Sequence, residues 1–292
     1  MNRLILLGFL FITVYANSQD IHWSQFNDNP LFQNPANAGG FQGDIRFIGN
    51  FRDQWRSVSV PFQTFNVSID RKAKNLNYGF YAFHDQAGDG KFKTIEMMGV
   101  VSKNFKLTSD STHVLCAGIN IGMNHRQVNT DAFYFDSQYN GYIFNPLLPT
   151  NELFQTDRKT NLNLGTGVIY SYNLTKRHYA KIGLSAFNLN RPNQGFYQDV
   201  IKRDIRWNLQ IKYCQALNSH WDILPALQFS KQGQYNELMI GSSIRYYLPG
   251  SNENYIHKAL LAGVWSRAKD AQILSFGCEY KDWFVGLSYD IN

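Results

Sequence analysis

The chain has 292 residues, of which 44% are hydrophobic, 15% aromatic and only 17% charged, with a formal net charge of +6. Soluble domains usually carry about a quarter charged residues, so this composition argues against a soluble exported domain. Beyond the N-terminus no run of about 18 apolar residues occurs, which excludes a helical membrane protein, and no basic cluster indicates nucleic-acid binding.

Residues 1–18 have the pattern of a secretory signal peptide. Arg3 gives a cationic start, an apolar run follows from Leu4 to Val14, and the small residues Ala16 and Ser18 suit a signal peptidase. The apolar run is too short for a membrane span, which needs roughly 20 residues. We therefore predict export from the cytoplasm and cleavage after Ser18.

Residues 19–42 precede the first predicted strand and contain turn residues at Asn34-Pro35 and at Ala38-Gly39-Gly40. This chemistry predicts an ordered lead-in, which we expect to lie in the periplasm.

Residues 43–292 are dominated by a period of two. Ile205, Trp207 and Leu209 alternate with Arg206 and Asn208, and similar segments of about ten residues recur between turn signals, as in a transmembrane β-barrel. We predict an all-β fold, an antiparallel outer-membrane β-barrel with about thirteen strands. The strands are expected at 43–52, 62–71, 76–86, 93–107, 112–125, 160–173, 178–189, 203–217, 220–230, 235–248, 255–267, 271–280 and 282–291.

The connections between these strands alternate in length for most of the chain. Short turns are expected at 72–75, 107–111, 175–177, 218–219 and 281–282, and longer connections at 53–61, 87–92, 126–159 and 190–202. Because such barrels have short periplasmic turns and long extracellular loops, this alternation predicts that the chain enters its first strand from the periplasm.

An odd strand number conflicts with the even number that closes bacterial single-chain barrels. We therefore expect a fourteenth, closing strand to be missing from a truncated chain, which leaves a gap between the first and last strands.

No catalytic or metal-binding pattern is convincing. His84 and Asp85 are adjacent, so on a strand they point to opposite faces, and Asp85 and Asp89 lack the other acids of a calcium loop. The three cysteines, Cys116, Cys214 and Cys278, are too scattered for a disulfide framework or a metal site. We predict no enzyme activity and no cofactor or metal. Glycines inside strands are expected to relieve crowding, either in the lumen or where the sheet curves.

Several separated blocks resemble the PorP/SprF family over nearly the whole mature chain. The most specific signal is an ordered series of matches between residues 25 and 70, at 25–30, 34–39 (Asn-Pro-Ala-Asn-Ala-Gly), 43–46, 52–56 (Arg-Asp-Gln-Trp-Arg), 61–65 (Pro-Phe-Gln-Thr-Phe) and 68–70. Three more matches follow at 83–88, 135–139 and 184–192. The resemblance implies a Bacteroidota outer-membrane barrel of the type IX secretion system. It also implies partners in the periplasmic ring of that machinery, or a secreted adhesin such as those of gliding motility. Members of the family generally continue beyond residues 288–290 into a final strand.

The residues that carry this resemblance are our candidate structural or partner-facing positions. They are Asn34, Pro35, Ala36, Gly39, Arg52, Gln54, Trp55, Arg56, Pro61, Asp85, Gly88, Arg191 and Pro192. Arg52, Trp55 and Arg56 are expected at the outer end of the first strand, as interfacial anchors. Lys72, Lys74, Lys176 and Arg177 lie in short turns and are candidate contacts with periplasmic partners.

Two functional hypotheses remain open. The first is a non-enzymatic barrel subunit that supports type IX secretion or anchors a surface protein. The alternative is a diffusion porin or hydrophobic-solute transporter, in which the polar strand faces line a water-filled lumen.

Overall fold

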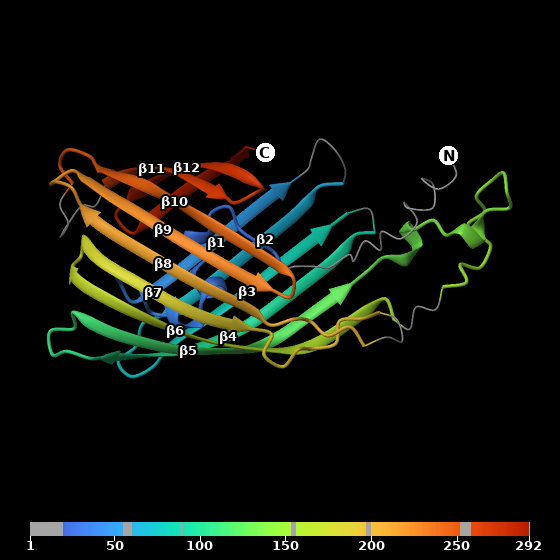
Figure 1. Cartoon of the computed structure of the whole chain (residues 1–292), viewed down its shortest axis with the longest axis horizontal. Helices are drawn as coiled ribbons and strands as arrows, with labels where there is room; N and C mark the ends of the chain where they lie inside the picture. The colour runs from blue at the N-terminus through green and yellow to red at the C-terminus, as the bar shows by residue number, and fades with distance from the viewer. Residues whose placement is uncertain are drawn as a thin grey trace, which may run out of the picture.

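One antiparallel sheet of thirteen strands makes up most of the computed structural model, which describes residues 20–54, 60–88, 90–152, 156–196, 200–251 and 258–291. Each strand pairs with the next one along the chain, and the sheet is strongly curved (Figure 1). The strands are β1 (Ile45–Gln54), β2 (Phe62–Arg71), β3 (Asn77–Ala87), β4 (Phe92–Lys106), β5 (His113–Gln127), β6 (Arg158–Thr175), β7 (His178–Phe187), β8 (Arg206–Ala216), β9 (Trp221–Gln232), β10 (Tyr235–Tyr247), β11 (Lys258–Arg267), β12 (Ala271–Tyr280) and β13 (Trp283–Ile291).

The prediction of thirteen antiparallel strands is confirmed. The largest error is of three residues, at the start of β8 (Arg206, expected at 203). The first residues expected for β11, 255–257, lie outside the described residues. The predicted signal peptide lies outside the described residues. Among the described residues, no helix is long and apolar enough to cross a membrane.

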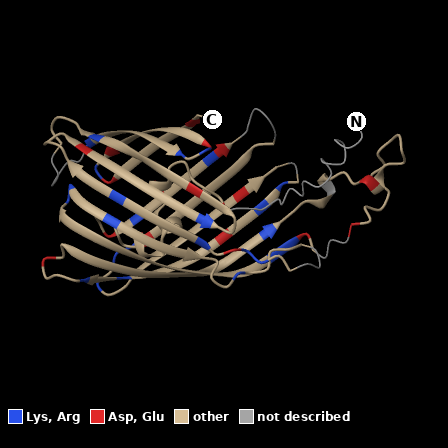
Figure 2. Cartoon of the chain, in the orientation of Figure 1, with Lys and Arg blue, Asp and Glu red and all other residues tan. Residues whose placement is uncertain are grey.

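The sheet is polar on its concave face and apolar on its convex face. In β2, Asn66 and Asp70 are fully buried, whereas Phe65 and Val67 are 50% and 41% exposed. In β13, Leu287 is 74% exposed. Lys, Arg, Asp and Glu occupy few strand positions (Figure 2). A soluble protein buries such apolar side chains, so this reversed polarity is that of a protein whose outer surface contacts lipid.

The first and last strands of the sheet face each other across a seam. No backbone pairing joins β1 to β13 in the part of the chain that the structure describes. The side chains of Arg52 and Asp290 nevertheless meet across the seam, with 3.3 Å between Nη2 and Oδ2. The sheet therefore curls far enough to bring its two edges within side-chain reach.

The predicted alternation of loop lengths holds only in part. The connection between β3 and β4, residues 88–91, was expected to be long, but it is shorter than the neighbouring connections of residues 72–76 and 107–112. Only Gly233 and Gln234 connect β9 to β10, although this connection lies at the end with the long loops. The longer connection of residues 248–257 lies at the other end. Short helical turns occur before β1, as η1 (Phe26–Asp28), α1 (Pro30–Gln33) and η2 (Pro35–Asn37), and after β5, as η3 (Thr130–Ala132) and η4 (Asp136–Gln138).

Candidate functional site

The N-terminal segment, residues 20–44, lies inside the curved sheet (Figure 1). Leu31 and Phe32 are buried in one apolar cluster with Tyr81, Phe83 and Met98. Phe26 packs edge-on against Trp265, with 5.2 Å between the ring centroids. The segment was expected to be ordered before the sheet, but its location within the sheet was not foreseen. The segment crosses the concave face because its apolar side chains find buried positions there.

Asn34 fastens the segment to two neighbouring strands. Its Nδ2 donates hydrogen bonds to the carbonyl oxygens of Val168 in β6, at 3.1 Å, and Leu184 in β7, at 3.2 Å. Its Oδ1 accepts from the Ala36 backbone N–H at 2.9 Å, which begins the turn of η2. One buried side chain thus shapes the segment and docks it.

The rest of the 34–39 block contacts further strands. Cys116 Sγ in β5 donates to the Ala36 carbonyl at 2.9 Å, and Ser102 Oγ in β4 donates to the Ala38 carbonyl at 2.8 Å. The Gly39 N–H donates to Asp70 in β2 at 2.8 Å. Four of the sequence-predicted residues, Asn34, Pro35, Ala36 and Gly39, therefore form one docking site.

Two strand glycines make room for this block. A Cβ atom on Gly118 would lie 2.6 Å from the backbone of Pro35 and Ala36, and one on Gly167 would overlap the Asn34 amide. Both glycines lie on the buried face. They thereby serve the expected purpose of relieving crowding, at the contact between segment and sheet.

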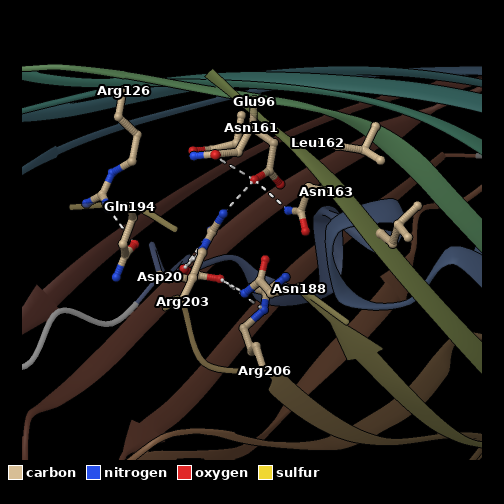
Figure 3. A network of polar contacts seen from close by, with 12 residues as sticks. Asp20, Glu96, Arg126, Asn161, Leu162, Asn163, Asn188, Gln194, Arg203 and Arg206 are labelled. Atoms are coloured by element: carbon tan, nitrogen blue, oxygen red, sulfur yellow. Dashed lines mark hydrogen bonds and ion pairs between the residues drawn. The ribbon is translucent and has the colours of Figure 1, made fainter. Parts of the chain in front are cut away.

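A buried charge network joins the start of the segment to the sheet (Figure 3). Arg203, in the connection between β7 and β8, contacts Asp20 Oδ1 at 2.6 Å and Glu96 Oε2 in β4 at 3.1 Å. Arg206 Nε lies 3.7 Å from Asp20 Oδ2. Burial opposes ionisation of Asp20, but the guanidinium groups of Arg203 and Arg206 outweigh it and lower its pKa to about 2.

Glu96 gathers additional donors around this network. Besides Arg203, its carboxylate accepts from Asn124 Nδ2 at 3.0 Å, from Asn163 Nδ2 at 3.1 Å and from the Tyr81 hydroxyl at 3.4 Å. The hydrogen-bonding capacity of the carboxylate is therefore used by these donors. The network is suited to fixing the N-terminal segment to the sheet rather than to proton transfer.

A second cluster ties the segment to the seam. Asp290 Oδ2 contacts Arg267 Nη2 at 3.0 Å and accepts from Ser24 Oγ at 2.9 Å, while Arg52 Nη1 donates to the His22 carbonyl at 2.6 Å. Burial and the nearby Arg52 and Arg267 lower the pKa of His22 to about 3. His22 is therefore neutral at physiological pH, and its 4.0 Å approach to Glu237 is not an ion pair.

A cavity of roughly 1610 Å³ remains beside the segment, toward β1, β2 and β13. Its lining mixes acids and bases, including Arg46, Arg52, Asp85, Arg267 and Asp290. No group of His, Cys, Asp or Glu in the described ranges could hold a metal ion.

The remaining family-motif residues lie apart from the docking site. Gln54 and Asp85 line the cavity, and Asp85 accepts from Thr64 Oγ1 at 2.6 Å. Arg191 pairs with Asp204 at 3.0 Å on the surface, and the Pro192 carbonyl accepts from the Arg203 N–H at 2.9 Å. Pro61 precedes β2, and Gly88 follows β3 with a positive φ of 65°.

The interfacial role expected for residues 52–56 needs correction at Arg52. Its side chain points into the sheet, because the His22 carbonyl and Asp290 bind its guanidinium there. Trp55 and Arg56 lie outside the described residues.

The four basic turn residues divide into two kinds. Lys72, Lys74 and Lys176 are exposed. Arg177 instead contacts Asp222, which is fully buried, with 2.6 Å between Nη2 and Oδ1, and its guanidinium lies 4.5 Å from the Tyr247 ring. The Arg177 side chain therefore holds the turn between β8 and β9 in place, and it is poorly placed to bind a partner protein.

Sequence reasoning missed Asp20, Glu96, Arg203, Arg267 and Asp290. Glu96 could have been singled out from the sequence, since it is the one charged residue between Lys93 and Lys103 and lies on a strand. The others carried no such signal, because their partners are far away in the sequence.

Comparison with known proteins identifies a family. The model of the type IX secretion system membrane protein PorP/SprF matches residues 15–292. No curated protein is detectably similar in sequence. Among solved structures, a KdgM porin aligns with a TM-score of 0.41 and 10% identity, over 85% of this chain and 99% of that chain. A mutant of the Rh. blastica porin aligns with a TM-score of 0.28 and 9% identity, over 85% of this chain and all of that chain.

Proposed function

This chain belongs to the PorP/SprF family of type IX secretion system membrane proteins, and we propose that it is a non-enzymatic β-barrel subunit in the outer membrane. In this role it supports the secretion, or the anchoring at the cell surface, of proteins with C-terminal sorting domains. Its partners are other subunits of the secretion system and the exported protein.

The observation that carries this proposal is the N-terminal segment docked inside the sheet. A diffusion pore needs a continuous wet lumen, whereas here residues 20–44 span the concave face and are fixed to it by Asn34 and by the Arg203 network. An interior that is partly filled by a fixed segment favours a scaffold or docking subunit. The reversed polarity of the strands supports the membrane location, because the lipid-facing side chains of a transmembrane barrel are apolar.

The cavity beside the segment favours the alternative of a diffusion porin. Its volume of roughly 1610 Å³ is large enough for small solutes, and its lining includes charged and polar side chains as well as apolar ones. The two functions differ in whether the cavity forms a continuous path, which conductance measurements decide.

The proposed function is tested by deleting the gene in its native host and quantifying secreted and surface proteins by mass spectrometry. We expect proteins with sorting domains to be lost from the surface and the medium, and to return when the gene is restored. Loss of all of them indicates a core subunit, and loss of one indicates a dedicated partner. An unchanged set in a strain without a second copy would contradict the proposal.

Three exposed lysines are our proposed contacts with periplasmic subunits. Lys72, Lys74 and Lys176 lie in short turns at one end of the sheet, and Arg177 is left out because it clamps its own chain. Reversing all three to Glu is expected to weaken co-purification of the secretion complex, most strongly at low salt. The matched control reverses Lys91 and Lys269, exposed lysines at the opposite end. Equal complex recovery from both variants would rule out this surface.

A further inference from the structure

The connection between β5 and β6, residues 128–157, carries a patch of exposed apolar side chains. It projects beyond the ends of the strands (Figure 1, green). Tyr142 is 96% exposed and Leu147 is 91% exposed, and Tyr134 and Ile143 are exposed as well. Four large apolar residues exposed on one loop are unusual for a surface with no partner.

The loop has internal structure that holds this patch outward. The Asn145 N–H donates to the Gln138 carbonyl at 2.8 Å, and Ser137 Oγ donates to the Thr150 carbonyl at 2.6 Å. The rings of Tyr134 and Phe144 pack edge-to-face, with 4.7 Å between their centroids. Because these contacts already order the loop, binding there loses less conformational entropy than binding to a flexible chain.

The turn that presents the patch is fixed by one side chain. Asn140 Oδ1 accepts from the N–H groups of Tyr142, at 3.1 Å, and Ile143, at 2.9 Å. The two neighbouring apolar side chains are therefore held at the tip, instead of folding back onto the loop.

The charge of the loop indicates which kind of surface it can bind. Residues 128–152 contain no Lys or Arg, and their acidic residues are Asp131, Asp136 and Glu152. Asp157, further along the connection, pairs with Arg158 at 3.2 Å. An acidic surface is repelled by anionic lipid head groups, which argues against insertion into a membrane. Aromatic side chains with acids around them instead complement a protein surface that has apolar pockets and a basic rim.

We propose that residues 128–152 form the docking surface for the exported protein, which binds through apolar pockets surrounded by lysine and arginine. This inference rests on the proposed function, in which the long loops face outward. Tyr142 and Leu147 are the anchors, since they are the most exposed apolar side chains in the described part of the loop.

The test compares two double variants in the native host. Tyr142→Ser with Leu147→Ser removes the anchors, and Val200→Ser with Ile201→Ser removes two exposed apolar side chains from the connection between β7 and β8. Both changes are on the surface, so the amount of barrel in the membrane should match the parent strain. Sorting-domain proteins retained on the cell surface are quantified by mass spectrometry, beside a gene deletion strain.

We expect the anchor variant to retain at least about thirtyfold less of the exported protein, as the loss of one binding hot spot predicts, and the control to retain the parental amount. Glu152→Lys is expected to lower retention as well, through its charge. If the deletion lowers retention and the anchor variant does not, the docking surface is wrong and the proposed function stands. If the deletion changes nothing, both fail. A photo-crosslinker at position 147 that labels lipopolysaccharide and no protein would also overturn the inference.

Discussion

Replacing Arg203 by methionine is expected to destabilise the folded chain by about 3–5 kcal/mol, the cost of breaking a buried ion pair from one side. Arg203 is the guanidinium shared by Asp20 and Glu96, whose carboxylates are both largely buried. Methionine fills a similar volume but leaves two negative charges close together without compensation. The expected structural result is release of the start of the N-terminal segment from the sheet.

The measurement is urea unfolding in detergent micelles, followed by tryptophan fluorescence and by the mobility of unheated samples in gels. Arg191→Met is the matched control, because Arg191 lies in the same connection and pairs with Asp204 while about half exposed. A surface pair of this kind contributes about 0–1 kcal/mol. Equal losses in the two variants would show that the buried network does not hold the segment.

The same network predicts how stability depends on acid. The folded-state pKa of Asp20 is about 2, below its ordinary value of 3.8. The ionised carboxylate of Asp20 therefore stabilises the folded state by about 2 kcal/mol. This stabilisation is fully present above pH 3.8 and is lost as the pH falls toward 2. In Asp20→Asn, the dependence of the unfolding free energy on pH should become weaker in this range, by the equivalent of about one bound proton. The pH dependence that comes from the other carboxylates should be unchanged.

The strands could be predicted from the sequence because their signal is local. Alternating residues such as Ile205, Trp207 and Leu209 report a strand with one face toward an apolar medium, and turn residues mark its ends. Each pairing then joins consecutive strands, so no long-range information is needed. This is why errors stayed within a few residues.

The interior could not be predicted in the same way, because its contacts join distant residues. Asn34 binds carbonyl groups more than 130 residues away, and Asp20 binds Arg203 at a separation of 183 residues. The 34–39 block was recognisable as a motif, but its turn chemistry suits an exposed lead-in as well as a buried one. Likewise, Arg52 looked like an interfacial anchor, since nothing nearby in the sequence indicated its partner Asp290.

Gly118→Val is expected to expel the N-terminal segment and to open the lumen. The new Cβ would lie 2.6 Å from backbone atoms of Pro35 and Ala36, which cannot move aside without releasing the 34–39 block. Overpacking of this kind costs about 3 kcal/mol, which lowers the ratio of docked to undocked segment by about a hundredfold. In planar bilayers, the parent protein should be silent or flicker, and the variant should conduct steadily.

Gly49→Val provides the matched control for conductance, because a Cβ at Gly49 in β1 meets no atom within 4 Å. Both substitutions place a β-branched residue in a strand, so a general effect on the sheet would appear in both. Steady conductance of Gly118→Val alone means that the docked segment closes the lumen, as a scaffold subunit requires. Steady conductance of the parent protein would instead mean that the cavity beside the segment is already a continuous path, and the chain would then have to be regarded as a porin.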